Sequence, residues 1–254
     1  MRAAVALTLT IAAVAAAAPA THAIPPAGWE PDVRAARAYA AQRQGVVTFH
    51  VRTERGRWSL DADRTVPSAS VIKAMLMVAY LDQDDVRNRA LTAADRALLD
   101  PMIRRSGNIA ATRVRDLVGD AALYRLAGRA RMTRFSTHPI WGLSRITARD
   151  QTRLWLRFES FLPARHREYA IGLLATIVPR QRWGFGRLTY PTGWELFFKG
   201  GWGSGTGLVE HQVALLRRGE ERVAIAILTT GSPSHAYGKR TLRGVAARLL
   251  RGLP

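Results

Sequence analysis

The sequence predicts a mixed α/β fold in which one antiparallel sheet of about five strands is flanked by the terminal helices and carries an all-helical subdomain. Strand-like segments lie at both ends of the chain, within residues 45–66 and 194–231. Helical periodicity fills the middle, and further helical segments lie outside the strands at 32–44 and 234–250. Strands from both ends can form a single sheet with the terminal helices on one face. The middle, about residues 68–180, is then an inserted helical subdomain.

The N-terminal part of this pattern predicts a helix followed by a hairpin. DVRAARAYAAQRQ (32–44) has a helical alanine and arginine pattern with no breaker. GVVTFHVRT (45–53) alternates apolar, β-branched and aromatic residues with polar ones, as a strand does. The polar ERGR that follows is a turn, so WSLDADRTV (58–66) is the expected partner strand.

The middle and the C-terminal part differ in the period of their apolar residues. In the middle, apolar residues recur at helical spacing in six segments. The expected helices are 71–83, 92–106, 108–119, 120–130, 146–162 and 167–177. After Tyr190 the pattern changes to strands separated by glycine-rich or charged turns, and an amphipathic helix ends the chain. The expected strands are 194–202, 207–218 and 221–231, and the helix is 234–250. We expect a ligand cleft between the sheet and the helical subdomain.

The length of 254 residues fits one domain, residues 24–254, after a short leader. Residues 1–23 have a positive start, an apolar run and small residues at two candidate cleavage sites, which predicts a signal peptide and secretion. The apolar run is short for a membrane span of roughly 20 residues, although an uncleaved anchor is the alternative. The chain has no cysteine, and its six histidines lack metal-ligand spacing, so we expect no metal and no cofactor. We also expect a monomer.

The formal net charge is +19, and only three of the 38 basic residues are lysines. This charge is typical of an ordinary solvated basic surface, and the functional alternative is attraction to an anionic polymer such as cell-wall glycan or phospholipid. The arginines are scattered and match no nucleic-acid-binding motif, so we expect no nucleic-acid partner and name an anionic cell-wall surface as the candidate partner. Lysine differs from arginine because its amine can lose a proton when it is desolvated. Lys73, Lys199 and Lys239 are therefore candidates for proton chemistry, although Lys239 lies in the C-terminal helix with no motif around it.

The first motif that carries chemistry is the S-x-x-K from Ser70 to Lys73, at the start of a predicted helix. A spacing of three places both side chains on one helical face. A serine hydroxyl becomes a good nucleophile when a neighbouring base removes its proton, and a desolvated lysine can do this. Backbone N–H groups at a helix start can also stabilise an oxyanion. The alternative is an ordinary serine near a helix start and a lysine that reaches solvent.

The second motif is Ser106-Gly107-Asn108, between two predicted helices. The serine hydroxyl suits proton relay, and the asparagine amide suits binding of a substrate amide. The alternative is a plain capping turn, because such junctions prefer these residue types.

The third motif is Lys199-Gly200-Gly201-Trp202, which follows the apolar strand segment WELFF. A lysine there suits a substrate carboxylate, and the glycines allow a substrate backbone to approach closely. The alternative is a glycine-rich turn with an incidental lysine.

In this order the three motifs resemble S-x-x-K, S-D-N and K-T-G of the active-site serine penicillin-recognising enzymes, specifically the class A β-lactamase-like branch. The resemblance runs from GVVTFHV to the C-terminal helix. It implies a β-lactamase/transpeptidase-like fold, an acyl-enzyme mechanism, and a β-lactam or peptidoglycan-derived substrate. The implied roles are nucleophile for Ser70, base or relay for Lys73, proton shuttle for Ser106, substrate binding for Asn108, Lys199, Gly200, Gly201 and Trp202, and oxyanion hole for the backbone N–H groups of Ser70 and Trp202.

The sequence departs from the family in three places. This chain has S-G-N where the family has S-D-N, and K-G-G where the family has K-T-G. The region 131–150 also lacks the glutamate of the family's E-x-x-L-N motif. That glutamate activates water in the family, so the resemblance implies slow deacylation. Asp150 is the first acidic residue of the region and is best interpreted as a helix N-terminal charge, and His138 is a weak alternative base. A D-Ala-D-Ala peptidase-like enzyme and a non-catalytic peptidoglycan-binding relative are the alternative functions.

Overall fold

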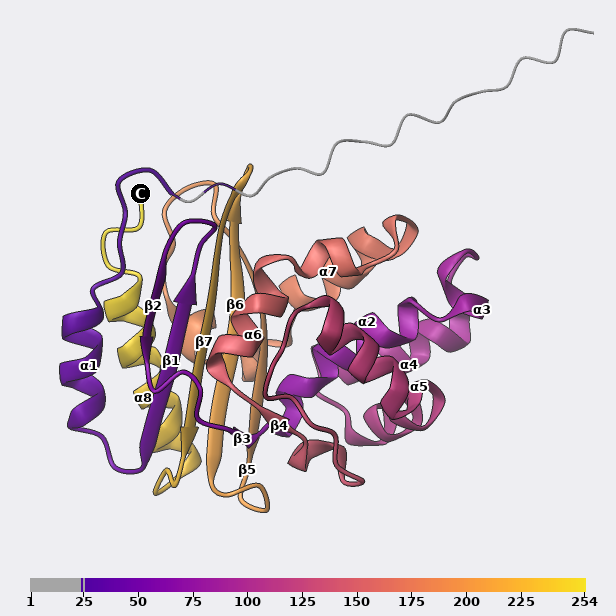
Figure 1. Cartoon of the computed structure of the whole chain (residues 1–254), viewed down its shortest axis with the longest axis horizontal. Coiled ribbons are helices and arrows are strands. Elements are labelled where there is room, and N and C mark those ends of the chain that lie inside the picture. Colours follow the sequence, from indigo (N-terminus) through magenta and orange to yellow (C-terminus); the bar gives the residue numbers. More distant parts are fainter. Residues whose placement is uncertain (1–23, 25) are drawn as a thin grey trace, which may run out of the picture.

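The computed structural model describes Ile24 and residues 26–254. The predicted signal peptide at 1–23 lies outside the described residues. The expected antiparallel sheet of five strands is confirmed, in the order β2-β1-β7-β6-β5. Its strands are β1 (Val46–Arg52), β2 (Arg57–Leu60), β5 (Glu195–Gly203), β6 (Val209–Arg218) and β7 (Glu221–Thr230). The strands of both chain ends meet where β1 pairs with β7 (Figure 1).

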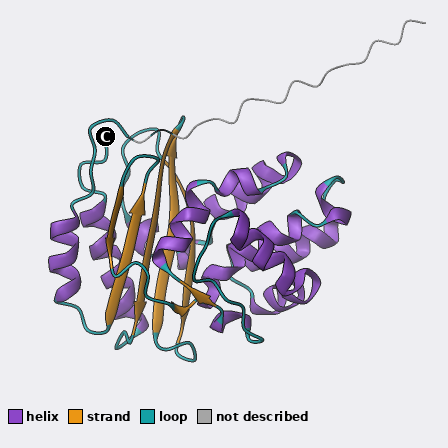
Figure 2. Ribbon diagram, viewed as in Figure 1, coloured by secondary structure: helices purple, strands orange, loops and turns teal. Residues whose placement is uncertain are grey.

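Helices cover both faces of this sheet (Figure 2). On one face α1 and α8 pack against each other and α8 packs on β6 and β7, while α6 covers β1, β6 and β7 from the other face. The remaining helices form the predicted helical part beyond α6 (Figure 1). The helices are α1 (Val33–Ala41), α2 (Lys73–Leu81), α3 (Asp84–Arg87), α4 (Ala93–Arg104), α5 (Asn108–Arg129), α6 (Ala148–Leu156), α7 (Arg167–Ala175) and α8 (His235–Leu249). In the described part of the chain, no helix has the length and apolar character needed to cross a membrane.

One predicted strand differs from the structure. The segment 58–66 is not one strand: β2 ends at Leu60, and Asp61 has φ 44°, a left-handed conformation that turns the chain out of the sheet. Its end forms β3 (Val66–Pro67), which pairs with β4 (Arg145–Ile146) in a separate small sheet. The helices predicted at 108–119 and 120–130 both lie within α5, whose helical conformation is interrupted at Gly119 (φ 66°, ψ 176°), so the break predicted between them is confirmed.

Burial on both faces explains why the central strands lack a clean alternation of apolar and polar residues. All of Val223–Thr229 in β7 are buried, because helices cover both faces of the sheet. In β1, Phe49 is fully buried between Leu60 of β2 and Ile227 of β7. The hydrophobic core therefore extends over both faces of the sheet.

Replacing Phe49 with alanine is expected to lower the free energy of unfolding by about 3–5 kcal/mol, because it removes a buried aromatic ring and leaves a cavity. Urea unfolding measures this loss. Leu117→Ala is the matched control, because the Leu117 side chain on α5 is 55% exposed and its truncation should cost no more than about 0.5 kcal/mol. Equal losses in both variants would contradict this description of the core.

Candidate active site

Ser70 lies in a 3-10 turn, Ala69–Ile72, that leads directly into α2. It is 8% exposed, and the preceding Ala69 has φ 43°, a conformation that is costly for a residue with a Cβ. A hydrogen bond of 2.7 Å from Ser68 N–H to the Ser144 carbonyl anchors this turn. The serine is thus held at a helix start, as the sequence predicts.

Lys73 points into the interior and is fully buried. Its Nζ donates to the Ser106 carbonyl at 2.6 Å, to Ser106 Oγ at 3.3 Å and to Asn108 Oδ1 at 2.8 Å. The Trp141 ring lies 4.7 Å from Nζ. Among the described residues no carboxylate pairs with this amine. Burial lowers the pKa of Lys73 to about 7, so the amine can both accept and release a proton near neutral pH.

Ser106 connects the two buried lysines. It lies between α4 and α5 with φ 55°, a left-handed conformation that is uncommon for serine. Its Oγ accepts hydrogen bonds from Lys73 Nζ and, at 3.0 Å, from Lys199 Nζ. Lys199 also donates to the Gly200 carbonyl at 2.8 Å. Burial and the charge of Lys73 hold the pKa of Lys199 well below its usual value. The Ser106 hydroxyl therefore connects the two amines by hydrogen bonds, and a proton can pass along these bonds.

The edge of β5 approaches the start of α2 so closely that it requires glycine. A Cβ added at Gly201 would lie 2.9 Å from both Ser70 N and Val71 N, closer than a carbon atom can approach a backbone nitrogen. A Cβ at Gly200 would lie 3.2 Å from the Trp183 ring. The K-G-G-W segment is thus packed directly against the backbone of Ser70. The structure brings the three sequence motifs to one place.

The hydrogen bond from Ser70 Oγ to Lys73 Nζ, which direct base catalysis requires, is not formed. Within the described residues Ser70 Oγ has no hydrogen-bond partner, and the amine of Lys73 is turned toward Ser106 and Asn108. Catalytic hydrogen bonds are often long or misaligned before substrate binds. The roles expected for Ser70, Lys73, Ser106, Asn108 and Lys199 stay predictions.

Two aromatic side chains that the sequence analysis did not single out form a wall beside Trp202. Trp183 packs edge-on against Trp202 with 5.7 Å between ring centroids, and His235 lies 6.0 Å from Trp202. Trp183 precedes β5 and His235 begins α8, so no local pattern connects them to the K-G-G-W segment. Trp183 is only 7% exposed and stands nearly perpendicular to Trp202, so it supports the partly exposed Trp202 ring at the end of the K-G-G-W segment.

A buried acid lies behind this wall. Glu210 on β6 is opposite Trp202 on β5, and only 4% of it is exposed. One carboxylate oxygen contacts Nδ1 of His235 and the other has no hydrogen-bond partner among the described residues. Burial raises the pKa of Glu210 to about 8, so the Glu210–His235 pair retains a proton at neutral pH. A glutamate inside the apolar run LVEHQVALL was the available sequence signal.

His211 also has a structural task that the sequence did not reveal. It is fully buried, and its Nε2 is 2.9 Å from the Pro67 carbonyl while Nδ1 accepts from the N–H of Thr229. Burial lowers the pKa of His211 to about 4, so the ring is neutral and links β6 to the segment that precedes Ser70.

The two candidate residues of the 131–150 region have local roles. Asp150, in the first turn of α6, accepts hydrogen bonds from the backbone N–H groups of Thr133 and Arg134 and pairs with Arg153. This confirms its interpretation as a helix N-terminal charge. Nδ1 of His138 accepts from the Ile140 N–H at 3.0 Å. No group of three or more metal-ligating side chains occurs in the part of the chain that the structure describes.

Comparison with known proteins gives a family match. The model of the β-lactamase enzyme family matches residues 87–253. This range includes Ser106, Asn108 and Lys199 but begins after Ser70 and Lys73. No curated protein sequence matches the chain.

Solved structures of similar fold support the architecture. A β-lactamase from Sphaerobacter thermophilus has a TM-score of 0.76 at 20% identity, covering 87% of this chain and 97% of its own. A β-lactamase from Xanthomonas campestris pv. campestris has a TM-score of 0.74 at 17% identity, covering 89% and 99%. A mutant of PBP-A, described as an acyl-enzyme complex with penicillin G, has a TM-score of 0.68 at 16% identity, covering 86% and 94%. At these identities the likeness concerns the fold.

Proposed function

Because this chain belongs to the β-lactamase enzyme family, we propose that it is a serine hydrolase whose Ser70 forms an acyl-enzyme with a β-lactam or a related amide or ester. The observation that carries this proposal is the pair of fully buried lysines joined by Ser106 beside the turn that holds Ser70. Burying two amines without a carboxylate partner costs stability, and such an arrangement is typical of a site that needs a proton acceptor.

In the proposed reaction, neutral Lys73 takes the proton of Ser70 Oγ, and the oxygen attacks the carbonyl carbon of the substrate. The backbone N–H groups of Ser70 and Trp202 stabilise the negative oxygen of the tetrahedral intermediate. When the C–N bond breaks, the leaving nitrogen takes a proton from Ser106, which the ammonium of Lys73 replaces. Lys199 holds the carboxylate of the substrate, and the Asn108 side chain binds the amide of the substrate. The product of this half-reaction is an ester on Ser70.

Deacylation should be slow, because residues 131–149 contain no glutamate or aspartate that can activate water. This absence and the fold likeness to a penicillin-acylated PBP-A mutant favour a D-Ala-D-Ala peptidase-like enzyme as the second candidate function. We propose peptidoglycan-derived peptides as its substrates.

Intact-protein mass spectrometry after incubation with penicillin G tests the proposal. We expect a mass increase equal to the whole penicillin molecule, because opening of the β-lactam ring loses no atoms. Peptide mapping should place it on Ser70, and it should decay slowly. Fast and complete hydrolysis of penicillin would contradict slow deacylation. If penicillin and a D-Ala-D-Ala peptide both failed to form an adduct on the protein and were not hydrolysed by it, the non-catalytic peptidoglycan-binding relative would be the better interpretation.

The acylation rate should depend on pH through Lys73. Burial lowers the pKa of this amine to about 7, and only the neutral amine accepts a proton. We therefore expect the rate to rise tenfold per pH unit below about 7 and to level off above it. Stopped-flow measurement of acylation over the acid and neutral range provides this profile. A rate that is independent of pH on both sides of 7 would exclude Lys73 as the base.

We also propose that residues 1–23 direct export, so that the enzyme acts outside the cytoplasm. The positively charged start and apolar run of this leader support the proposal. N-terminal sequencing of protein recovered from the culture medium tests it, and a mature chain that begins near residue 24 is the expected result. A chain that keeps residue 1 and stays with the membrane fraction would indicate an uncleaved anchor.

A further inference from the structure

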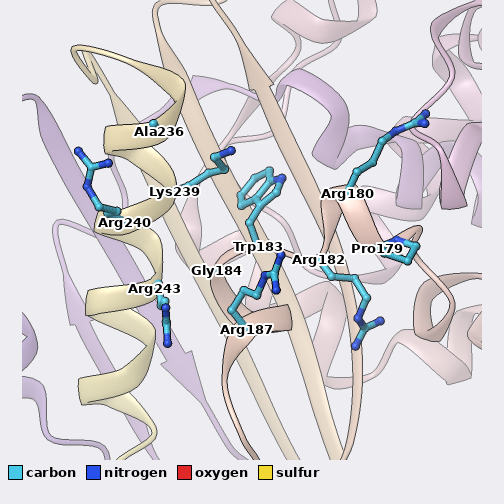
Figure 3. Close-up of a pocket in the computed structure, with 10 residues that line it drawn as sticks. All are labelled: Pro179, Arg180, Arg182, Trp183, Gly184, Arg187, Ala236, Lys239, Arg240 and Arg243. Carbon is cyan, nitrogen blue, oxygen red and sulfur yellow. The ribbon is translucent and has the colours of Figure 1, made fainter.

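A hollow of about 330 Å³ lies between α8 and the segment 179–187 that precedes β5 (Figure 3). Six of the ten residues that line it are cationic, and none is acidic. The cations are Arg180, Arg182, Arg187, Lys239, Arg240 and Arg243. None of these six forms an ion pair within the described part of the chain. Arginines elsewhere do form them, for example Arg149 with Asp63 and Arg217 with Glu195.

The hollow has a fixed floor. Trp183 is 7% exposed, and its carbonyl accepts a hydrogen bond of 2.7 Å from Gln212 Nε2, while Gln212 Oε1 accepts one of 2.8 Å from the N–H of Phe185. Gly184 has φ 56°, and a Cβ there would overlap Gln212 Oε1. The backbone of this turn is therefore fixed to β6. The floor also belongs to the wall of the active site, because Trp183 packs against Trp202.

The arrangement of the cations is uneven. Figure 3 shows Lys239 and Arg187 extending toward the Trp183 ring from the two sides of the hollow, whereas Arg180 and Arg240 lie at its rim and point outward. Because these cations have no carboxylate partner in the described part of the chain, an anion in the hollow would gain attraction from several of them at once. Because Lys239 and Arg187 face the Trp183 ring and the other cations lie around the rim, a ligand with several negative charges complements the site better than a single carboxylate.

We propose that this arginine pocket binds an anion that carries more than one phosphate group. The planar guanidinium groups match phosphate oxygens with paired hydrogen bonds, and the lysine amine supplies a further point charge. The site shares Trp183 with the wall beside Trp202, but none of its six cations is a group proposed to act on Ser70, so the proposal does not depend on the proposed hydrolase function. The same phosphate chemistry is offered by a soluble oligophosphate and by the headgroups of an anionic lipid surface.

Isothermal titration calorimetry with tripolyphosphate at low salt tests the proposal. The variant Arg187→Glu/Arg243→Glu reverses two exposed charges from the two sides of the hollow and should weaken binding by about tenfold or more. The control Arg55→Glu/Arg165→Glu reverses two exposed, unpaired charges that do not line the pocket, and should change the affinity by no more than about twofold. Circular dichroism verifies folding, and Arg187→Gln alone should give a smaller loss in the same direction.

The source of the phosphate is decided by sedimentation with phosphatidylglycerol vesicles. Vesicle binding that is lost in Arg187→Glu/Arg243→Glu and kept in the control identifies lipid headgroups, whereas tripolyphosphate binding without vesicle binding identifies a soluble oligophosphate. The proposal is overturned if wild-type protein does not bind tripolyphosphate, if both double variants weaken binding equally, or if tricarballylate binds as tightly as tripolyphosphate.

Discussion

Replacing Lys73 with methionine is expected to slow acylation of Ser70 by about 10²–10⁴-fold, because this removes the buried base. The same change should leave the free energy of unfolding at neutral pH unchanged or raise it. The pKa of Lys73 is lowered to about 7 from 10.5, so between these values the unfolded chain binds a proton that the folded chain has released. Stability therefore rises with pH across this range, and below about 7 the buried ammonium destabilises the fold to its full extent.

Methionine removes this destabilisation, but it leaves the Ser106 carbonyl and Asn108 Oδ1 without the donor they have now, at a cost of about 1–3 kcal/mol. Thermal unfolding and penicillin acylation, measured on the same preparation, separate the two effects. Lys73→Arg is the informative companion, because arginine keeps the charge but cannot act as a base. If Lys73→Arg acylates as fast as wild type, the lysine serves as a charge and not as a proton acceptor.

Gly201→Ala should reduce the acylation rate by about 10²–10³-fold, comparable to the loss of one oxyanion-hole donor. The added methyl group would lie 2.9 Å from Ser70 N, so β5 and the turn that holds Ser70 must move apart. The backbone of Trp202, which follows Gly201 directly, would move with the strand. We expect the substitution to lower mainly the acylation rate. The free energy of unfolding, measured with urea, should change far less, because the shift occurs at the edge of the sheet.

The matched control is Gly205→Ala in the β5–β6 turn, where an added Cβ meets nothing within 4 Å. It should acylate at a rate close to that of wild type. Comparable losses of rate in Gly201→Ala and Gly205→Ala would show that strand rigidity, and not the contact with Ser70, explains the effect. An unchanged rate in Gly201→Ala would rule out an oxyanion site between Ser70 and Trp202.

The sequence was a good guide to the elements and to the order of the motifs. Apolar residues at period two in the terminal segments and at helical period in the middle were enough to predict the sheet and the helices, because these patterns reflect which side of an element is buried. The prediction was wrong at 58–66, whereas the break between two helices at 119 was confirmed. The difference arises at Asp61, whose positive φ turns the chain out of the sheet and is not visible in the apolar pattern.

Sequence by itself determined that a serine and a lysine lie one helical turn apart, and that two further motifs follow in a recognisable order. Only the tertiary structure decided what their chemistry can be. Burial from surrounding elements lowers the pKa of Lys73, and Ser106 meets Lys199 from 93 positions away. The arginine pocket likewise lies between α8 and the segment 179–187, which are far apart in the sequence. The desolvation of an amine and the distance between two charges depend on which residues, distant in the sequence, pack together. Only the folded chain determines these contacts.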